Sequence, residues 1–246
     1  GDMCHAGEVP AEMENVIKRE LGNLRVRVND MMICRDKRDH IEIRMQAKTT
    51  KGRLVTARET AQVLSELFGK SFMPSRESHN VIPKEETEMI FVEDTPLLAV
   101  TGVGRRRKEG EEVSGDSFSC LSLPNGELLL ALSDGMGSGE GALGESQVVI
   151  ELLEQMTEAG FSKISALKLI NSLYMPEAVQ TRFATADVVV LDLYQGSCQF
   201  MKNGAAATWL RRGDHVERIE GQALPVGVYQ DAEPYFQKTE IYSGDY

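Results

Sequence analysis

The stretch "LLLALSDGMGSGEGALGESQVVIELLEQM", from Leu128 to Met156, decides the fold. An apolar run ends at Ser133-Asp134, a glycine-rich loop follows, and a segment with apolar residues at helical spacing begins after the loop. This order predicts a buried strand, a tight loop and a helix. Asp134 stands at the end of the strand, where its side chain can reach a cleft while its neighbours pack below. Gly135 and Gly137 allow the backbone to turn closely around whatever Asp134 binds.

The loop also contains Gly139 to Gly144, which spells G-x-G-x-x-G. A dinucleotide-binding loop of this kind needs a helix and then a second parallel strand that ends in an acid about 20 residues on. In this chain the helix leads through Ala159-Gly160 into another helical pattern. The sequence therefore disfavours a nucleotide-binding oxidoreductase and directs attention to Asp134.

A second carboxylate, Asp116, is predicted to lie beside Asp134. The segment from Asp116 to Asp134 holds two apolar runs joined by Pro124-Asn125-Gly126, which is typical of a β-hairpin. Both acids then fall at its open end, where they repel each other unless a cation lies between them. Oxygen ligands without cysteine or histidine favour Mg²⁺ or Mn²⁺. The alternative is that Asp116 caps a strand and Asp134 forms an Asx turn.

Composition and charge limit the classes of function. The net charge is −11, and residues 114–246 hold 8 Lys and Arg against 18 Asp and Glu, whereas residues 1–113 hold 19 against 20. An acidic half disfavours nucleic-acid binding and favours cations. The four cysteines form no C-x-x-C pair, as expected for reduced thiols in a cytoplasmic protein. No apolar run is long enough for a membrane span, and no signal peptide is apparent.

The pattern along the chain predicts two domains of α+β class. Residues 1–86 are expected to form a small α+β module with a linker, because residues 70–86 are polar and broken by Pro74 and Pro83. Residues 87–246 are expected to form the main domain, in which two successive helices lie between runs of antiparallel strands. The helices expected are at 11–23, at 55–69, after the glycine loop to about 158, and at 163–175. A hairpin is expected at 116–134, and strands are expected at 24–35, 41–48, 87–93, 97–104, 185–194, 198–204, 207–213, 215–219 and 236–242.

At these residues the chain resembles the metal-dependent protein phosphatases of the PP2C class, and most closely their stage II sporulation protein E branch. The resemblance covers roughly Val100 to Tyr246. It is carried by "SGDSFS" (114–119), "LALSDGMGSGEGA" (130–142), "LKLINSLYM" (167–175), "ATADVVVLDL" (184–193), "FMKNGAAATWLRRGDHV" (200–216) and "LPVGV" (224–228).

The resemblance implies a PP2C-like sandwich of two antiparallel sheets flanked by helices, with two Mn²⁺ or Mg²⁺ ions at one end. By motif match, Asp116 and Asp134 would be the catalytic metal ligands, with Asp134 bridging, and the Gly135 carbonyl would complete the set. A metal-activated water would attack phosphoserine. The implied substrate is a phosphorylated anti-anti-sigma factor, whose dephosphorylation activates a sporulation sigma factor.

Further residues near Asp116 and Asp134 are candidates for supporting roles. Arg105, Arg106 and Arg107 lie just upstream of Asp116, where they could meet a substrate phosphate, although a solvated basic turn is the commoner outcome for such a cluster. Asp187 is a candidate for the outer shell of the metal site. Asp192, on the same predicted strand, is interpreted as structural.

The chain departs from the family pattern at its end. The resemblance implies further metal-binding aspartates in a Ser-Asp-Gly strand and an Asp-Asp segment, but this chain stops at "IYSGDY". We therefore expect a truncated phosphatase domain, and the sequence leaves open whether it is active alone. Its parent is expected to be anchored in the membrane at the division septum by segments absent here. The N-terminal module would regulate or self-associate, giving a homodimer. The alternative function is a non-catalytic module with a PP2C-like fold that binds partners or self-associates.

Overall fold

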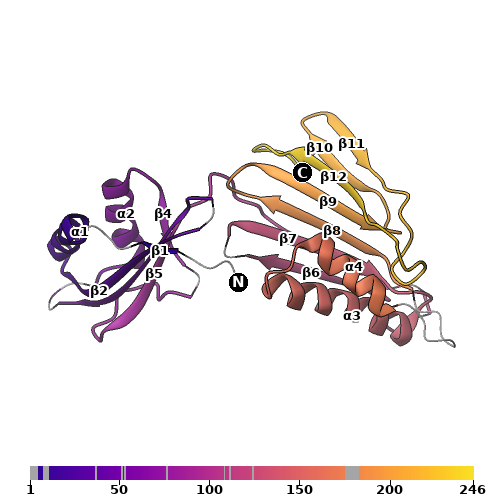
Figure 1. Cartoon of the computed structure of the whole chain (residues 1–246), viewed down its shortest axis with the longest axis horizontal. Coiled ribbons are helices and arrows are strands. Elements are labelled where there is room, and N and C mark those ends of the chain that lie inside the picture. Colours follow the sequence, from indigo (N-terminus) through magenta and orange to yellow (C-terminus); the bar gives the residue numbers. More distant parts are fainter. Residues whose placement is uncertain are drawn as a thin grey trace. The chain divides into compact units, whose positions relative to one another are not determined.

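The computed structural model describes residues 5–7, 11–36, 38–50, 52, 54–75, 77–107, 109–110, 112–123, 125–174 and 183–246. The chain divides into two compact units, residues 2–95 and residues 96–246 (Figure 1). Each unit has a core of its own. Within the described ranges, no helix is both long and apolar enough to cross a membrane.

The N-terminal unit is an antiparallel sheet of five strands in the order β1-β2-β3-β5-β4, with two helices packed on it. Alternation in β2 and β3 turns one side chain in two toward the helices, so that Ile33, Ile43 and Phe91 of adjacent strands all lie in the core. The elements are β1 (His5–Gly7), α1 (Ala11–Asn23), β2 (Val26–Arg35), β3 (Ile41–Thr49), α2 (Ala57–Phe68), β4 (Phe72–Pro74) and β5 (Thr87–Glu93).

Helix α2 begins and ends at residues suited to helix termini. Thr56 accepts a hydrogen bond from the Glu59 backbone N–H, and the Glu59 carboxylate accepts one from the Thr56 backbone N–H, which is a capping box. Gly69 ends the helix in the left-handed conformation, with φ of 65°. The predicted closure of this helix at Gly69 is confirmed.

The predicted boundary between the domains is wrong. Strand β5, assigned from sequence to the main domain, pairs with β3 and β4 inside the N-terminal sheet, and the units divide between Thr95 and Pro96. Part of the predicted linker is also core, because Phe72 and Ile82 are buried with the rest of the N-terminal unit. Residues 97–104, predicted as a strand, form none, and Leu98 and Val100 are about nine-tenths exposed.

The C-terminal unit is built on a second antiparallel sheet, in the order β12-β9-β8-β7-β6, accompanied by a separate two-stranded hairpin, β10-β11. Two helices lie between β7 and β8 in sequence. The elements are β6 (Asp116–Ser122), β7 (Glu127–Asp134), α3 (Gly139–Glu158), α4 (Lys163–Tyr174), β8 (Ala186–Asp192), β9 (Ser197–Asn203), β10 (Thr208–Arg212), β11 (His215–Ile219) and β12 (Tyr235–Glu240).

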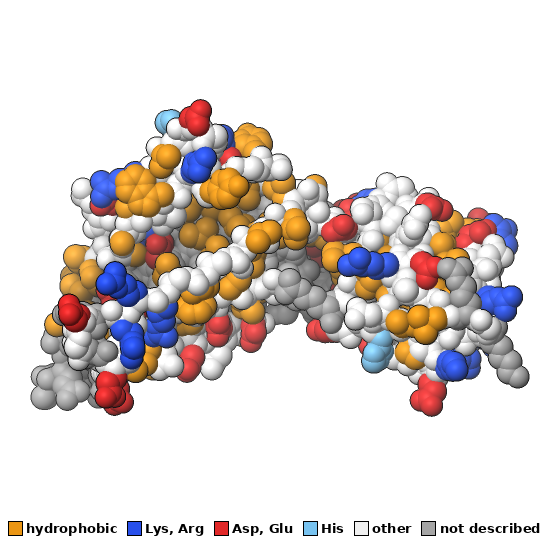
Figure 2. Space-filling view, turned by 180° about the vertical axis from the view of Figure 1, so that it is seen from behind, with side chains coloured by type: hydrophobic (Ala, Val, Ile, Leu, Met, Phe, Trp, Pro, Cys, Tyr) orange, Lys and Arg blue, Asp and Glu red, His pale blue; other side chains and the backbone are white. Residues whose placement is uncertain are grey.

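The helices and the hairpin occupy opposite faces of this sheet. Val149 and Leu153 of α3 and Ile170 of α4 share a core with one face. Leu210 and Ile219 of the β10-β11 hairpin pack on the other face, over β8, β9 and β12. That second face stays open farther along, where Phe118 and Leu132 are exposed, and Figure 2 shows hydrophobic side chains gathered on the C-terminal unit. The α+β class and the layered antiparallel arrangement predicted from the sequence are confirmed.

Candidate metal centre

The register of the β6-β7 hairpin brings two acids together. Asp116 pairs directly with Asp134 at the open end of the hairpin, and both side chains are exposed to solvent. Residues directly opposite each other in an antiparallel pair point to the same face, with Cβ atoms about 4.5–5.5 Å apart. The predicted juxtaposition of these two carboxylates is confirmed. Asn125 and Gly126 form the turn as expected, with φ of 74° at Gly126, and Pro124 lies outside the described residues.

Neighbouring hydroxyl groups hold both strand ends in place. Ser114 donates a hydrogen bond of 2.9 Å to Oδ2 of Asp116. Thr185, just before β8, accepts from the Asp134 backbone N–H at 2.8 Å and donates its own N–H to the Asp134 carbonyl at 2.9 Å. The backbone that carries Asp134 is therefore fixed from both sides, because β6 pairs with it on one side and Thr185 on the other.

The electrostatics of the pair favour a cation. Partial burial raises the pKa of Asp134 above its ordinary value, and the charge of Asp116 and a hydrogen bond between the two carboxyl groups raise this pKa further. Two carboxylates in this arrangement are costly to keep ionised together. A divalent cation placed between them removes this cost, and oxygen ligands suit Mg²⁺ and Mn²⁺.

Glycines bring helix α3 close to the acid pair. A Cβ atom on Gly135 would lie 1.8 Å from the carbonyl oxygen of Ala142, and one on Gly115 would lie 2.9 Å from the Ala142 Cβ. Glycine at both positions therefore lets the first turn of α3 pack against the strand ends. Gly137 adopts a φ of 95°, which only glycine takes up readily, and this turns the chain from β7 into the helix.

The donor set fits a divalent cation in kind. Asp116 and Asp134 supply carboxylate oxygens, and the residue after Asp134 is the glycine whose carbonyl was predicted as a ligand. Among the residues that the structure describes, no group of three or more His, Cys, Asp or Glu side chains gathers to hold a metal. The carboxylate ligands at this strand end are therefore Asp116 and Asp134. A backbone carbonyl and water molecules would have to complete the coordination of the cation.

The three arginines predicted near the site are placed differently from one another. Arg105 donates from Nη2 to the backbone carbonyls of Ser114, at 2.9 Å, and Asp116, at 2.6 Å. Arg107 donates instead to the Glu112 carbonyl at 2.9 Å, and Arg106 is exposed. Only Arg105 is thus seen bonded to the strand end that carries an acid of the pair.

Asp187 lies on the same sheet face as the acid pair and has a partner that the sequence analysis missed. It pairs with Leu132 across β7-β8, so it is one diagonal step from Asp134. Lys202 of β9, fully buried, donates to Asp187 Oδ2 at 2.6 Å. The sequence signal for a buried Lys202 was the alternation of β9, which puts Lys202 on the same face as the buried residues Phe200 and Cys198. Asp192 is buried at the far end of β8 and accepts from two turn N–H groups, in agreement with a structural role.

Comparison with known proteins identifies the family. A family model described as stage II sporulation protein E matches residues 124–246, which are half of the chain. This chain belongs to the stage II sporulation protein E family. The matched region contains Asp134, Gly135 and Asp187, and Asp116 lies just before it.

Two curated relatives are both described as stage II sporulation protein E. The protein from Priestia megaterium is 31% identical over 93% of this chain, and the protein from Bacillus subtilis strain 168 is 31% identical over 75%. The chain spans only 40% and 22% of their respective lengths.

A solved structure supports the fold of the whole chain. It is described as the PP2C phosphatase domain and a fragment of the regulatory domain of the cell fate determinant SpoIIE from Bacillus subtilis. It matches with a TM-score of 0.63 and 26% identity, over 96% of this chain and 74% of the other. The PP2C-like fold predicted from the sequence is thereby confirmed.

Proposed function

We propose that the C-terminal unit is the phosphatase part of a metal-dependent protein serine phosphatase of the PP2C class. The observation that carries the proposal is the direct pairing of Asp116 with Asp134 at an exposed strand end. Membership of the stage II sporulation protein E family and the match to a PP2C phosphatase domain support it.

The residues of the site have separable tasks in this proposal. Asp116, Asp134 and the Gly135 carbonyl hold Mn²⁺ or Mg²⁺. Such ions, when bound, supply an activated water and neutralise charge on phosphoryl oxygens. Ser114 orients the Asp116 carboxylate through its hydrogen bond, and Thr185 fixes the backbone of Asp134. Arg105, fixed to the Asp116 carbonyl, places a positive charge beside the acids, where it favours the approach of a phosphoryl group.

The proposed substrate is phosphoserine in a phosphorylated anti-anti-sigma factor, and its dephosphorylation would activate a sporulation sigma factor. This part of the proposal rests on the family alone, since relatives of this chain are named for sporulation. The acidic C-terminal half agrees with a site that recruits cations and not nucleic acid.

We propose that the N-terminal unit regulates the phosphatase and joins two copies of the chain. The related structure from Bacillus subtilis is described as containing a fragment of a regulatory domain, and it matches nearly the whole of this chain. The unit has its own sheet and core, so it can act as a separate association module.

One observation favours a second function. The described residues offer the cation two carboxylates and no larger acidic group. If these do not suffice for catalysis, the chain is a partner-binding module with a PP2C-like fold. The two functions differ in whether phosphate is released, and this can be measured.

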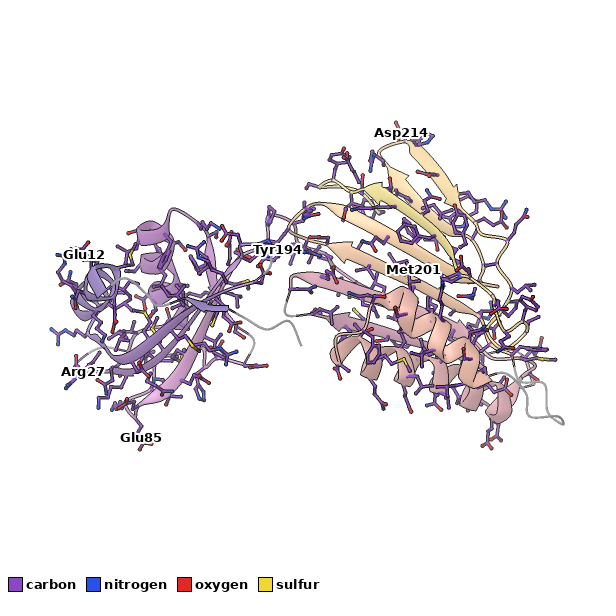
Figure 3. The ribbon with its side chains drawn as sticks, viewed as in Figure 1. Glu12, Arg27, Glu85, Tyr194, Met201 and Asp214 are labelled. Atoms are coloured by element: carbon purple, nitrogen blue, oxygen red, sulfur yellow. The ribbon has the colours of Figure 1, made fainter. Side chains whose placement is uncertain are left out.

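The test is release of phosphate from a phosphoserine anti-anti-sigma factor in Mn²⁺, with EDTA as the metal-free control. Asp134→Asn is expected to lower the rate more than about 100-fold, because loss of a direct ligand should exceed the 10–100-fold cost of losing an outer partner. Asp214→Asn is the matched control, since Asp214 is an exposed acid at the tip of the β10-β11 hairpin (Figure 3). Calorimetry with Mn²⁺ alone accompanies the assay.

The outcomes separate the two functions. Metal-dependent release that Asp134→Asn abolishes and Asp214→Asn preserves supports the phosphatase. Mn²⁺ binding without release supports the partner-binding module. Release by Asp134→Asn at the wild-type rate would remove the metal assignment.

A further inference from the structure

A buried lysine makes three hydrogen bonds next to the proposed metal site. Lys202 is fully buried, and its ammonium group donates to Asp187 Oδ2 at 2.6 Å, to the Ala206 carbonyl at 2.7 Å and to Thr208 Oγ1 at 2.7 Å. Thr208 in turn donates to Asp187 Oδ2 at 3.1 Å. All three protons of the ammonium group are therefore used, and this network joins β8 and β9 to the first residue of the β10-β11 hairpin.

The second carboxylate oxygen of Asp187, Oδ1, takes no part in this network. Oδ1 is buried, and no hydrogen-bond partner for it exists among the described residues. Asp187 itself is only 9% exposed. Buried polar atoms in folded proteins nearly always have a partner, so an orphan acceptor calls for a donor such as a water molecule or an ion-bound group.

The position of Asp187 indicates where that donor comes from. Its pairing with Leu132 puts it on the face that carries Asp116 and Asp134, and it is the diagonal neighbour of Asp134. Diagonal neighbours across an antiparallel pair are about 7–8 Å apart. At this separation between residues, a water molecule can lie between the Asp187 carboxylate and a cation held by the acid pair.

Stability alone does not explain the buried ion pair of Asp187 and Lys202. A buried ion pair costs desolvation of both charges, and apolar residues of similar volume often replace one without loss of stability. Here the lysine also reaches outside the sheet, to Ala206 and Thr208, at the start of the hairpin. The network therefore links the hairpin to the face that carries the acids.

We propose that Asp187 and Lys202 are positioning residues for the metal site. Lys202 and Thr208 hold Asp187 Oδ2, and this orientation presents Oδ1 to a water molecule of the cation bound by Asp116 and Asp134. Cation binding and docking of the β10-β11 hairpin are thereby coupled, and the coupling acts in both directions. This inference rests on the proposed metal site and deepens it.

The first experiment measures Mn²⁺ affinity by calorimetry. The double variant Asp187→Ala with Lys202→Met removes the network without leaving a lone buried charge. It is expected to bind Mn²⁺ about 10–100-fold more weakly, as when an outer partner of a metal ligand is lost. The matched control is Glu127→Ala with Lys163→Met, which removes an ion pair of 2.5 Å at the other end of β7. Asp134 is seven residue steps along β7 from Glu127, about 23 Å, so this control should bind Mn²⁺ as the wild type does.

The second experiment measures hydrogen exchange in the β10-β11 hairpin with and without Mn²⁺. In the wild type, Mn²⁺ is expected to slow exchange of the hairpin amides, and in the double variant it should not. Thr208→Val keeps both charges and is milder, so it provides a readout even if the double variant does not fold. It should reduce the Mn²⁺-dependent protection of the hairpin.

Each outcome decides the matter. Equal Mn²⁺ affinity in the wild type and the double variant overturns the positioning role, and so does an equal loss in the Glu127 and Lys163 control. Unchanged Mn²⁺-dependent protection in Thr208→Val overturns the coupling. A wild type that binds no Mn²⁺ removes the proposed metal site itself, and this inference with it.

Discussion

At the scale of single residues, the close approach of α3 to the acid pair depends most strongly on glycine at position 135. The nearest atoms to a Cβ on Gly135 would be backbone atoms of Ala142, at 1.8 Å for the oxygen and 2.6 Å for the carbon. Backbone in the first turn of a helix cannot move aside as a flexible side chain can. Gly135 therefore sets how closely the helix lies to Asp134.

We predict that Gly135→Ala destabilises the C-terminal unit by about 1–3 kcal/mol, the usual cost of forcing extra volume into a packed site. Gly141→Ala is the control, because no heavy atom lies within 4 Å of its added Cβ and the residue is helical. The control should stabilise the unit by roughly 0.5–1 kcal/mol. Urea unfolding measures both. A Gly135→Ala protein as stable as the wild type would show that the helix can shift freely, against this account.

The acid pair could be predicted from the sequence, whereas the buried lysine beside it could not. The pairing of Asp116 with Asp134 was predictable, because a turn at Asn125-Gly126 fixes which residues face each other. Lys202 was not singled out, because a lysine within an apolar strand is usually interpreted as an exposed position. Alternation in β9 places Lys202 on the face of the buried Phe200, but its partners Asp187 and Thr208 lie outside that strand and add no local signal.

At the scale of elements, the turn between β2 and β3 shows how one carboxylate holds two strands in register. Asp36 Oδ1 accepts from the backbone N–H groups of Arg38, at 2.7 Å, and His40, at 2.9 Å, and its Oδ2 lies 2.9 Å from His40 Nδ1. Burial acts to raise the pKa of Asp36, but these hydrogen bonds outweigh it and bring the pKa below the usual 3.8.

A lowered carboxyl pKa predicts a definite dependence on pH. The ionised form of Asp36 stabilises the folded state above pH 3.8, and this stabilisation is lost as the pH falls through the lower folded-state pKa. Asp36→Asn should therefore lower the free energy of unfolding at neutral pH, by about 1.5–3 kcal/mol, the usual contribution of a hydrogen bond to a charged group. The difference should vanish in acid.

Urea titrations of the wild type and Asp36→Asn, from neutral pH downward, measure this dependence. Glu85→Gln removes one charge from an exposed position of the same unit and controls for net charge (Figure 3). A difference that persists unchanged in acid would show that the carboxylate charge is not what stabilises the turn.

The positions of helices and strands were predicted better than the sheet to which each strand belongs. Helix α2 and the hairpin β6-β7 follow from caps, turns and periodicity, which are local signals. Strand β5 was recognised but assigned to the wrong unit, because alternation shows that a strand exists and not which strand it pairs with. The segment 70–86 looked like a linker since its prolines and polar residues outnumber Phe72 and Ile82, whose burial depends on the rest of the core.

At the scale of the whole molecule, each unit should fold alone if it is cut in the right place. The core of the N-terminal unit includes Met89 and Phe91 of β5, both fully buried. A cut after residue 86, where the sequence analysis put the boundary, removes this strand. A cut after Thr95 keeps it.

We therefore predict that residues 1–95 fold cooperatively and that residues 1–86 do not. Loss of a buried Phe or Met side chain costs about 2–5 kcal/mol each, and a domain has only about 5–15 kcal/mol in total. Circular dichroism during thermal unfolding distinguishes the two fragments. If both melt with the same cooperative transition, β5 is dispensable and the boundary in the structure is not the folding boundary.

Light scattering on residues 1–95 then tests the proposed self-association of the N-terminal unit. A mass above that of one copy supports it, whereas a monomer would move any self-association to the C-terminal unit.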